Sequence, residues 1–258
     1  MQQNSKIKTV LFVPTYNVAG TVAEVLRRIP SEALEKLDSI YLVDNGSHDG
    51  TREIITDIVA QDKKGKYRCF LNESNYSLGG STIIAFREAI KQQADYLICM
   101  HSDGQADPMD LTKFLNAIRE DQPDFVFGNR MAEENKEYSK LRLWGNKFFA
   151  MLQRILVNRP IQDIGSFIAF KLDTVEKLKY WQYRHDMGYH PLLILEAFRK
   201  LNPKWIDIPI KWGKVEETNI NPFVYGIQHL WRISRLFFNR PPITQHNIHH
   251  FRSSEYGR

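Results

Sequence analysis

Apolar runs of strand length alternate with segments of helical periodicity along the first half of the chain. Runs rich in β-branched and aromatic residues predict strands at residues 8–16, 39–50, 67–74, 94–100 and 123–130. Apolar residues at helical spacing predict helices between them, at residues 19–29, 51–61, 79–93 and 108–121. This alternation is typical of an α/β protein with a mostly parallel central sheet that helices cover on both faces.

The second half of the chain has a different pattern. Residues 139–158 and 221–238 combine apolar residues at helical spacing with many aromatic and basic residues, which predicts two amphipathic helices. Further elements are expected as a turn and strand at 159–170, a helix at 190–201 and a strand at 205–212. The tail at 239–258 has no clear pattern, so we expect it to be loosely ordered.

Composition indicates an ordinary globular protein. The chain has 258 residues, of which 43% are hydrophobic and 25% are charged. We expect a main domain at 1–215, with halves at about 1–130 and 131–215, followed by an amphipathic helix and tail at 216–258. No run approaches the roughly 20 apolar residues that span a bilayer. The polar N-terminus leads straight into a strand, so we expect no signal peptide.

Charge and cysteine content add two expectations. The net charge of +5 and the pI of about 9.1 suit an anionic partner, such as a nucleotide, a lipid phosphate or a membrane surface. Nucleic acid is not expected, because the basic residues are not concentrated at the strand ends. Cys69 and Cys99 lie in apolar runs and do not have metal-ligand spacing. We interpret them as reduced core residues of a cytosolic protein. A buried disulfide between them is the alternative.

Three polar clusters directly follow expected strands of the first half. They are PTYN at 14–17, VDNGSHDGT at 43–51 and HSDGQADP at 101–108. The carboxyl ends of parallel strands lie at one edge of a sheet, where open α/β sheets bind their ligands. We therefore expect the clusters to meet in one crevice. Each cluster taken alone could be a polar turn, since Asp, Gly and Pro are ordinary turn residues.

Five motifs together resemble those of one enzyme family. VPTYN, LVDNGSHDGT, HSDGQADP, FGNR and DIGSFIAF occur in the order and at the distances typical of the inverting nucleotide-sugar glycosyltransferases of family two, which have a GT-A fold. The resemblance covers roughly residues 7–215 and is strongest to the dolichyl-phosphate and polyprenyl-phosphate mannose and glucose synthases. It implies sugar transfer from a UDP- or GDP-sugar to a polyprenyl-phosphate or lipid-linked acceptor at the cytosolic face of a membrane.

Two other functions remain open from the sequence. The same fold could transfer a sugar to a saccharide hydroxyl in cell-surface polysaccharide synthesis. It could also be a nucleotide-binding protein whose catalysis has decayed. Val18, His101 and Ile168 favour decay, because the resemblance leads us to expect Glu, Asp and Arg at these positions.

The resemblance assigns a set of donor-binding residues. Asp44 and Asn45 resemble the pair that reads the nucleotide base, with an Asx-turn as the alternative. Gly79 and Gly80 lie in a segment that resembles the Gly-rich segment near the diphosphate, although Ser77 replaces one usual glycine. The expected donor-binding residues are Pro14, Thr15, Tyr16, Asp44, Asn45, Gly79, Gly80, Ser102, Asp103 and Arg130.

A divalent cation, Mn²⁺ or Mg²⁺, is expected at the third polar cluster. Charge develops on the β-phosphate as the sugar leaves, and a cation held by oxygen ligands can neutralise it. By resemblance, Asp103 and Gln105 bind this cation. His101 replaces the first Asp of the family's Asp-x-Asp pattern, so we expect it to be a metal ligand, with a weak or dispensable metal site as the alternative. Asp107 would support the loop or cap the next helix.

The match is less complete on the acceptor side. Arg130 resembles an arginine that grips phosphate, with a surface ion pair as the alternative. Asp163 lies where inverting relatives place an acid, which could deprotonate a hydroxyl acceptor, whereas a phosphate acceptor needs no base. The expected catalytic residues are Asp103, Asp163 and Arg130, and the expected acceptor- or phosphate-binding residues are Arg142, Lys211 and Lys214.

The two basic aromatic helices could lie in a membrane interface or pack in the core. Their aromatic residues are Trp144, Phe148 and Phe149 in the first helix, and Trp231, Phe237 and Phe238 at the second. A polyprenyl substrate requires contact with a membrane, so we expect these helices to bind its surface and the protein to be peripheral to the inner face.

Overall fold

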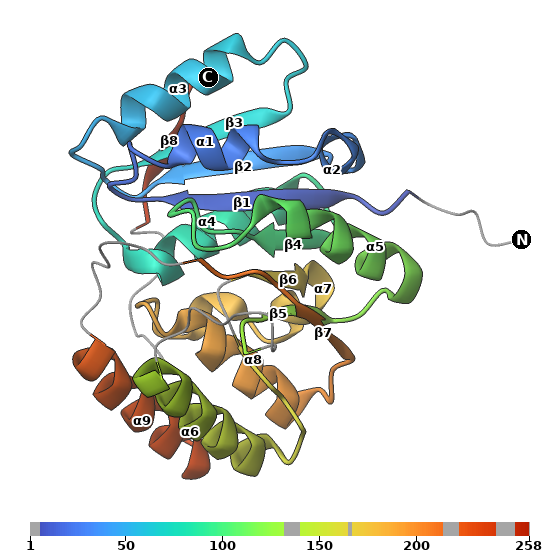
Figure 1. Ribbon diagram of the computed structural model, residues 1–258, viewed down its shortest axis with the longest axis vertical. Helices are drawn as coiled ribbons and strands as arrows, with labels where there is room; N and C mark the ends of the chain where they lie inside the picture. The colour runs from blue at the N-terminus through green and yellow to red at the C-terminus, as the bar shows by residue number, and fades with distance from the viewer. Residues whose placement is uncertain (1–5, 132–139, 165–166, 214–221, 241–250, 258) are drawn as a thin grey trace, which may run out of the picture.

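One central sheet divides the molecule into two helical layers (Figure 1). This computed structural model describes residues 6–131, 140–164, 167–213, 222–240 and 251–257. The strands are β1 (Thr9–Thr15), β2 (Ser39–Asp44), β3 (Tyr67–Asn72), β4 (Tyr96–Cys99), β5 (Phe125–Asn129), β6 (Ile168–Lys171), β7 (Trp205–Pro209) and β8 (Ser253–Glu255). Within the described residues, they form a single sheet in the order β7-β5-β6-β4-β1-β2-β3-β8.

Most neighbouring strands are parallel, as the alternating sequence predicts. β1 lies in parallel between β2 and β4, while β2 pairs with β3 and β5 pairs with β7 in the same manner. Inside the sheet, β6 is the exception, since it runs antiparallel to both β4 and β5. The carboxyl ends of β1, β2, β4 and β5 therefore share one edge of the sheet, and this edge positions the polar clusters.

Helices connect successive strands in the first half and gather at one end of the molecule in the second half (Figure 1). Those of the first half are α1 (Val22–Arg27), α2 (Ser31–Lys36), α3 (Thr51–Gln61), α4 (Ser77–Lys91) and α5 (Leu111–Asp121), with a 3₁₀ turn η1 (Pro108–Asp110) before α5. Those of the second half are α6 (Lys140–Val157), α7 (Leu172–Lys177), α8 (Tyr189–Lys200) and α9 (Pro222–Phe237), with a 3₁₀ turn η2 (Tyr180–Gln182).

Alternate side chains of each strand enter two different cores. Val10 and Phe12 of β1 pack with residues of α4 and α8 on one face of the sheet, whereas Leu11 and Val13 pack with residues of α1 and α5 on the other. This follows from the two-residue period of a strand. Because both faces are buried, the strands have continuous apolar runs in the sequence.

The cysteines are reduced core residues, as expected. Cys69 and Cys99 are both buried and free. Cys69 belongs to the core that contains α1 and α5, and Cys99 belongs to the core on the opposite face of the sheet. The sheet therefore separates the two thiols, which rules out the alternative of a disulfide between them.

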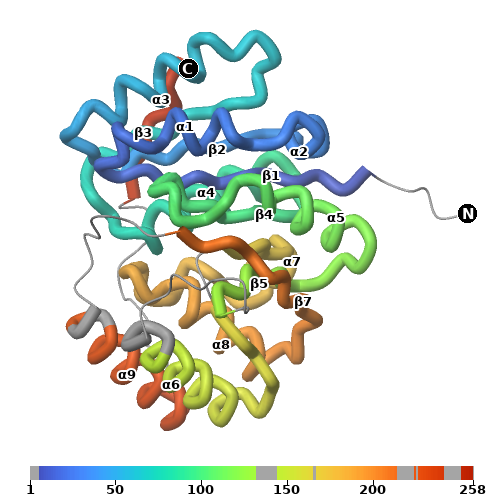
Figure 2. The backbone as a smooth tube through the Cα atoms, in the orientation of Figure 1, coloured from blue at the N-terminus to red at the C-terminus, as the bar shows by residue number. Residues whose placement is uncertain are grey.

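The end of the chain is more ordered than its sequence predicts. β8 pairs antiparallel with β3, so that Glu255 lies opposite Phe70 and Ser253 lies opposite Asn72. Figure 2 shows this segment at the edge of the sheet, far along the chain from the strand beside it. The expectation of a loosely ordered tail is wrong for residues 251–257. A three-residue strand has too few positions to show a periodic pattern, and its partner is remote in the sequence.

At the opposite end of the molecule, α6 and α9 pack against each other and against α8 (Figure 1). Both amphipathic helices expected from the sequence are therefore present. In the described part of the chain, no helix is long and apolar enough to cross a membrane.

Candidate functional site

Hydrogen bonds join the polar clusters that follow β1, β2 and β4. Between the first two clusters, Asn17 N donates to Ser47 Oγ at 3.1 Å, and His48 N donates to Asn17 Oδ1 at 3.0 Å. Between the first and third, Ser102 Oγ donates to Pro14 O at 2.7 Å, and Thr21, just before α1, donates its hydroxyl to Ser102 O at 2.7 Å. The three clusters thus meet at the carboxyl edge of the sheet.

Several expected donor residues hold this edge together. Thr15 is buried, and its hydroxyl donates to Val43 O at 3.0 Å, which links the ends of β1 and β2. Ser102 is also buried, and its bond to Pro14 links the ends of β4 and β1. Tyr16, directly after β1, is half-buried. The hydroxyls of Thr15 and Ser102 therefore hold the strand ends together, and a direct contact with a donor stays a prediction.

Asp44 is fully buried at the end of β2 and is paired with Arg52. Its Oδ2 accepts hydrogen bonds from Arg52 Nε at 2.9 Å and Nη2 at 2.7 Å, and its Oδ1 accepts one from Ser47 N at 3.1 Å. The bond to Ser47 spans three residues, whereas an Asx-turn closes on the N–H two residues on, so this bond is not the Asx-turn that was the alternative interpretation of this motif. The sequence interpretation missed Arg52, although an arginine in the first turn of α3 can reach back to the strand end.

Asn45 is the centre of a buried amide network. Its Oδ1 accepts hydrogen bonds from Tyr76 N at 2.8 Å and from Asn72 Nδ2 at 3.2 Å, and its Nδ2 donates to Asn75 Oδ1 at 2.9 Å. The bond from a backbone N–H fixes which end of the amide carries the oxygen. The network ties the loop after β2 to the segment after β3 and sets the orientation of Asn45.

Gly79 and Gly80 allow close packing in the first turns of α4. A Cβ on Gly79 would lie 2.3 Å from the backbone carbonyl carbon of His185, and one on Gly80 would lie 2.4 Å from Tyr76 Cβ. Any larger residue would push these segments apart. Gly79 therefore sets the contact between α4 and the loop that contains His185, and Gly80 sets the contact with Tyr76. The contact of either glycine with a diphosphate stays a prediction.

The loop after β4 is joined to the segment after β7. Gly213 N donates to Gln105 O at 2.8 Å, and Ala106 forms an antiparallel bridge with Trp212. Lys211 N donates to Asp110 Oδ2 at 2.8 Å, while the Lys211 side chain is exposed. Lys211 is thus brought close to the loop that contains Asp103 and Gln105. Lys214 and the Arg142 side chain lie outside the described residues.

Asp107 is an N-cap, as the alternative interpretation held. Its Oδ1 accepts hydrogen bonds from Met109 N at 3.1 Å and from Arg28 Nη2 at 2.8 Å. It caps η1, in which Pro108 is the first residue. Asp107 therefore anchors the far end of the loop and points its carboxylate at Arg28.

His101, Asp103 and Gln105 lie in one short loop and fit a cation shared with a substrate. Asp103 Oδ1 accepts a hydrogen bond from Gln105 N at 3.0 Å. His101 Nε2 is buried and has no hydrogen-bond partner among the described residues. Burial lowers the pKa of His101, the Asp103 carboxylate opposes this effect, and Arg130 adds to it, so the imidazole is held neutral, as a metal ligand must be.

The donor set is small for a closed metal site. In the described part of the chain, no three His, Cys, Asp or Glu side chains lie close enough together to hold a metal ion. An imidazole, a carboxylate and an amide oxygen leave coordination positions for the oxygens of a diphosphate. These residues therefore suit a cation that binds together with a nucleotide.

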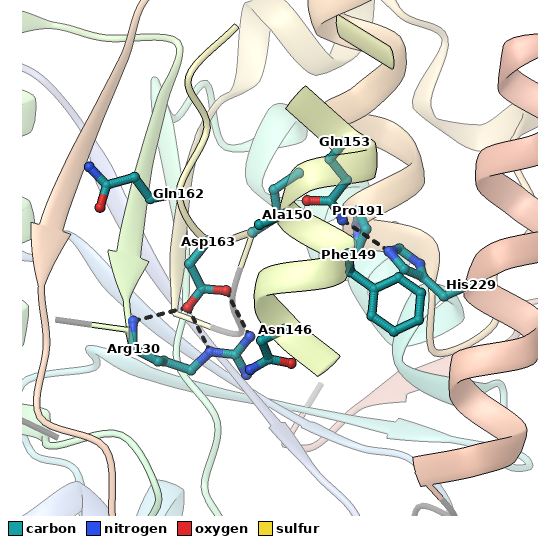
Figure 3. Close-up of a pocket in the computed structure, with 10 residues that line it drawn as sticks. Arg130, Asn146, Phe149, Ala150, Gln153, Gln162, Asp163, Pro191 and His229 are labelled. Carbon is teal, nitrogen blue, oxygen red and sulfur yellow. Dashed lines mark hydrogen bonds and ion pairs between the residues drawn. The ribbon is translucent and has the colours of Figure 1, made fainter. Parts of the chain in front are cut away.

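Arg130 follows β5 and is held by Asp163 (Figure 3). Arg130 Nε and Nη2 each donate to Asp163 at 2.8 Å, and Arg130 N donates to the same carboxylate at 2.9 Å. The guanidinium also lies over the Trp212 ring, 5.1 Å from its centroid. The side chains are only 18% and 5% exposed, so the pair is not the surface ion pair that was the alternative for Arg130.

A small polar cavity lies between this ion pair and the inner sides of α6 and α9 (Figure 3). Its volume is about 60 Å³, and Arg130, Asp163, Gln153 and His229 contribute polar groups to its wall. Gln153 Nε2 and His229 Nε2 lie 2.9 Å apart and connect α6 to α9. Burial, assisted by Arg232, lowers the pKa of His229 to about 4, so this histidine is neutral near pH 7.

Residues 10–179 match the family model for glycosyl transferase family 2. The chain belongs to this family. It is 27% identical over 217 residues to a UDP-N-acetylglucosamine–dolichyl-phosphate N-acetylglucosaminyltransferase of Methanococcus voltae. The matched region covers 78% of this chain and 84% of that relative. It is 23% identical over 250 residues to an undecaprenyl-phosphate mannosyltransferase of Micrococcus luteus. This second match covers 87% of the chain and 96% of the relative.

Solved structures show the fold of this family 2 protein. A mannosyltransferase of Pyrobaculum calidifontis, in complex with GDP-Man and Mn²⁺, is similar with a TM-score of 0.62 at 17% identity. The similarity covers 92% of this chain and 64% of the solved chain. The α/β, GT-A fold class expected from the sequence is confirmed.

The outward sides of α6 and α9 in this family 2 protein expose apolar side chains. On α6 the exposed residues Trp144, Phe148, Met151 and Ile155 recur at intervals of four, three and four residues, which places them on one face of the helix. At α9 the exposed apolar residues are Val224, Ile227, Leu230, Trp231, Phe237 and, just after its end, Phe238. Trp144 and Phe238 are 74% and 76% exposed.

Of the aromatic residues that the sequence singled out on these helices, Phe149 differs from the rest. It is half-buried, packs against the core and meets the His229 ring at a centroid distance of 5.0 Å. The two helices therefore have distinct sides, with Phe149, Gln153 and His229 turned to the cavity and an apolar row turned to solvent.

The apparent departures of the sequence have local explanations. Ile168 is fully buried at the start of β6, where its side chain belongs to the core beneath α4 and α8. Val18 donates its backbone N–H to Thr51 Oγ1 at 2.8 Å and packs against the core on the other face. An arginine or a glutamate at these positions would need a different packing of the surrounding core.

Proposed function

We propose that the protein transfers a sugar, with inversion, from a UDP- or GDP-sugar to a polyprenyl phosphate at a membrane surface. The observation that carries this proposal is the position of the Arg130–Asp163 pair, which shares a cavity with the inner sides of α6 and α9. The outward sides of the same helices expose apolar residues. A lipid held at that surface would have its phosphate close to the crevice at the strand ends.

The names of the similar proteins support this substrate class. The relatives from Methanococcus voltae and Micrococcus luteus are named for dolichyl-phosphate and undecaprenyl-phosphate. The solved mannosyltransferase binds GDP-Man, and the Methanococcus voltae relative is named for a UDP-sugar. Both nucleotides therefore remain candidates for the donor of this chain.

The donor would lie across the ends of β1, β2 and β4. Asp44 would accept a hydrogen bond from the base, and Asn45, whose oxygen already accepts two bonds, would donate its second Nδ2 hydrogen to the base. Arg52, Ser47 and Tyr76 set the orientation of these two side chains. The loop with His101, Asp103 and Gln105 would hold a divalent cation, which would neutralise charge on the diphosphate. Arg130 would face the phosphates with its guanidinium held in place by Asp163 and Trp212.

The transfer itself needs no proton acceptor when the nucleophile is a phosphate. An oxygen of the acceptor phosphate forms the bond to the anomeric carbon while the bond from that carbon to the donor diphosphate breaks. The electron pair of the broken bond stays on the departing nucleoside diphosphate, and the attack from the opposite side inverts the configuration. A fixed positive charge near the diphosphate stabilises this transition state more than the ground state.

The state of Asp163 favours a phosphate over a hydroxyl acceptor. Both of its oxygens accept hydrogen bonds from Arg130. These bonds direct both carboxylate oxygens at Arg130 and away from an acceptor hydroxyl, so the geometry does not favour a general base. We therefore infer that Asp163 positions Arg130, in place of the base role expected for a hydroxyl acceptor.

A transfer assay tests the proposal. The protein is incubated with radiolabelled UDP- and GDP-sugars, Mn²⁺ and vesicles that contain undecaprenyl phosphate, and the label is then followed into the organic phase. We expect label in the lipid fraction and its loss on mild acid hydrolysis. Label that moves only to a water-soluble saccharide would support the hydroxyl-acceptor alternative. Nucleotide binding without turnover of any donor would support decayed catalysis.

We also propose that the outward faces of α6 and α9 bind the membrane surface. Contiguous exposed apolar surface is uncommon on a monomeric protein and usually marks an interaction site. Lys147, Arg154 and Arg235 lie on the same helices, and their charges suit the anionic lipids of a cytosolic leaflet. Aromatic and aliphatic residues flanked by basic ones are typical of helices that lie in an interface.

Vesicle flotation tests the membrane proposal. The double variant Trp144→Ser and Phe148→Ser removes two exposed rings of α6, and Met109→Ser is the control, since Met109 is 57% exposed at η1, away from α6 and α9. With phosphatidylcholine–phosphatidylglycerol vesicles, we expect the double variant to bind about tenfold or more weakly. Added salt should weaken wild-type binding, because it screens the basic residues. Equal flotation of all three proteins would contradict the proposal.

A further inference from the structure

The end of the chain lies beside the strand end where the nucleotide base is expected. β8 extends the sheet next to β3, and backbone bonds continue the pairing on both sides of it. Glu73 N donates to Arg252 O at 3.2 Å, and Tyr256 N donates to Cys69 O at 2.9 Å. Residues 251–256 are therefore docked along the strand that leads into the Asn72–Tyr76 segment.

Phe251 packs where three segments meet. Its ring centroid lies 5.0 Å from that of Tyr76 and 4.7 Å from that of His185. Arg252 N also donates to the Tyr76 hydroxyl at 3.3 Å. Tyr76 is thus held by the chain end at its ring and at its hydroxyl.

Tyr76 in turn holds Asn45. Its backbone N–H donates to Asn45 Oδ1 at 2.8 Å, and the adjacent Asn75 accepts a hydrogen bond from Asn45 Nδ2 at 2.9 Å. The path from Phe251 to Asn45 therefore has only one intermediate residue. Asn45 follows Asp44 directly at the end of β2, so a shift of Tyr76 would be felt at both residues expected to read the base.

An ion pair anchors the far end of the segment. Arg68 Nε and Nη2 donate to the two carboxylate oxygens of Glu255 at 2.6 and 2.9 Å, and both side chains are largely buried. Arg68 Nη1 lies 3.1 Å from the Tyr41 hydroxyl, which ties the pair to β2. A bidentate contact of this kind has a defined geometry, so it fixes the position of β8 along β3.

We propose that residues 251–255 are a positioning element for nucleotide binding, and that Phe251 acts on Asn45 through Tyr76. This inference rests on the proposed function, because it assigns the base of the donor to Asp44 and Asn45. Phe251 does not itself touch the expected nucleotide position. It keeps the Asn45 amide in the orientation that binds a base. The amide is then already ordered before the nucleotide arrives, so ordering it does not reduce the binding free energy.

Calorimetry with UDP and with GDP, in the presence of Mn²⁺, tests the inference on the 258-residue chain. The variants are Phe251→Ala, the conservative Phe251→Tyr, and the control Tyr256→Ala, whose side chain is 43% exposed on the same segment. For the nucleotide that the wild type binds, we expect Phe251→Ala to raise Kd about three- to tenfold, the range of an aromatic contact. Phe251→Tyr should restore the affinity, and Tyr256→Ala should match the wild type.

The kinetic signature separates positioning from general destabilisation. In the transfer assay, Phe251→Ala should raise KM for the donor by the same factor and leave kcat within about twofold. An unchanged Kd for Phe251→Ala, measured below its unfolding temperature, would overturn the inference even if the variant unfolds more readily. Failure of the wild type to bind either nucleotide would instead overturn the proposed function, and the inference with it.

Discussion

Polar side chains at the strand ends are buried, whereas apolar side chains on the outward sides of α6 and α9 are exposed. At the ends of β1, β2 and β4, Asp44, Asn45 and Ser102 are buried and bonded to other parts of the chain. On the outward side of α6, Trp144 and Ile155 face solvent. A buried, satisfied polar network sets one geometry, which suits recognition of a small charged ligand. An exposed apolar row is incomplete without a partner, which suits a lipid surface.

The cavity beside Arg130 lies where these two regions meet. Arg130 follows β5, and its partner Asp163 lies between α6 and β6. The Gln153–His229 contact forms the opposite part of the cavity wall. If the proposed function is right, substitutions at the strand ends should have the largest effect on the chemical step. Substitutions at the ion pair should affect the position of the Arg130 guanidinium. Substitutions on the outer helical face should affect only membrane binding.

The largest effect is expected for Asp103→Ala. Its carboxylate is the best candidate for a metal ligand, and its loss should lower kcat by about a thousandfold or more. The fold should remain intact, because the described hydrogen bond of the Asp103 side chain is local, from Gln105 N. The measurement is transfer rate, with circular dichroism as the check of folding. Asp57→Ala, an exposed position on α3, is the control. Near wild-type transfer by Asp103→Ala would contradict the assignment of the site.

The next effect is expected for Asp163→Asn. The amide cannot accept both guanidinium bonds, so Arg130 loses its anchor and kcat/KM should fall about a hundredfold. Because Asp163 acts through Arg130, the double variant with Arg130→Lys should lose little more than the larger of the two single losses. Additive losses in this double-mutant cycle would show that Asp163 has a separate role, such as that of a base.

Asp207 on β7, on the acceptor side, makes the free energy of unfolding depend on pH. Burial raises its pKa to about 6, helped by Asp163 and opposed by Trp205 and Arg154. Its Oδ1 is buried without a hydrogen-bond partner among the described residues. The folded state therefore binds the proton on Asp207 more tightly than the unfolded state does. The stabilisation that results is fully present below about pH 4 and is lost as the pH rises through about 6.

Asp207→Asn should remove this dependence. We expect the variant to be more stable than the wild type by about 2 kcal/mol at pH 7.5 and nearly equal at pH 3.5, in urea unfolding. Asp49 on the donor side is the comparison, since hydrogen bonds from Thr51 and Ala19 lower its pKa although burial alone would raise it. Its contribution has the opposite sign and is lost as the pH falls. A stability difference for Asp207→Asn that did not change with pH would contradict the assigned pKa.

The smallest effect is expected for the choice of metal. With His101 as a ligand, donor affinity should be about tenfold higher in Mn²⁺ than in Mg²⁺, because imidazole suits transition metals better. His101→Asp should reduce this preference, and calorimetry of donor binding in each metal measures it. Equal donor affinity of the wild type in Mn²⁺, Mg²⁺ and chelator would show that His101 binds no metal.

Much of the fold could be predicted from local pattern. The helix expected at 51–61 has the bounds of α3, Thr51–Gln61, and the strand expected at 8–16 contains β1, Thr9–Thr15. The buried sheet produces long apolar runs, and each run ends at turn residues that mark the strand end. The short helices α2 and α7 were not predicted, because six residues contain fewer than two turns and give little periodic signal.

The sequence by itself determined the order of the longer strands and helices, the edge of the sheet where the polar clusters meet, and the family. These depend on residues close together in the chain, where period and motif are visible. Only the tertiary structure decided the partners of the functional side chains: Arg52 for Asp44, Asp163 and Trp212 for Arg130, and β8 for β3. Arg68 and Glu255 are 187 residues apart in the chain, and no local pattern encodes that contact. Such pairs form because the folded sheet brings buried charges together, and a buried charge is stable only when it is paired.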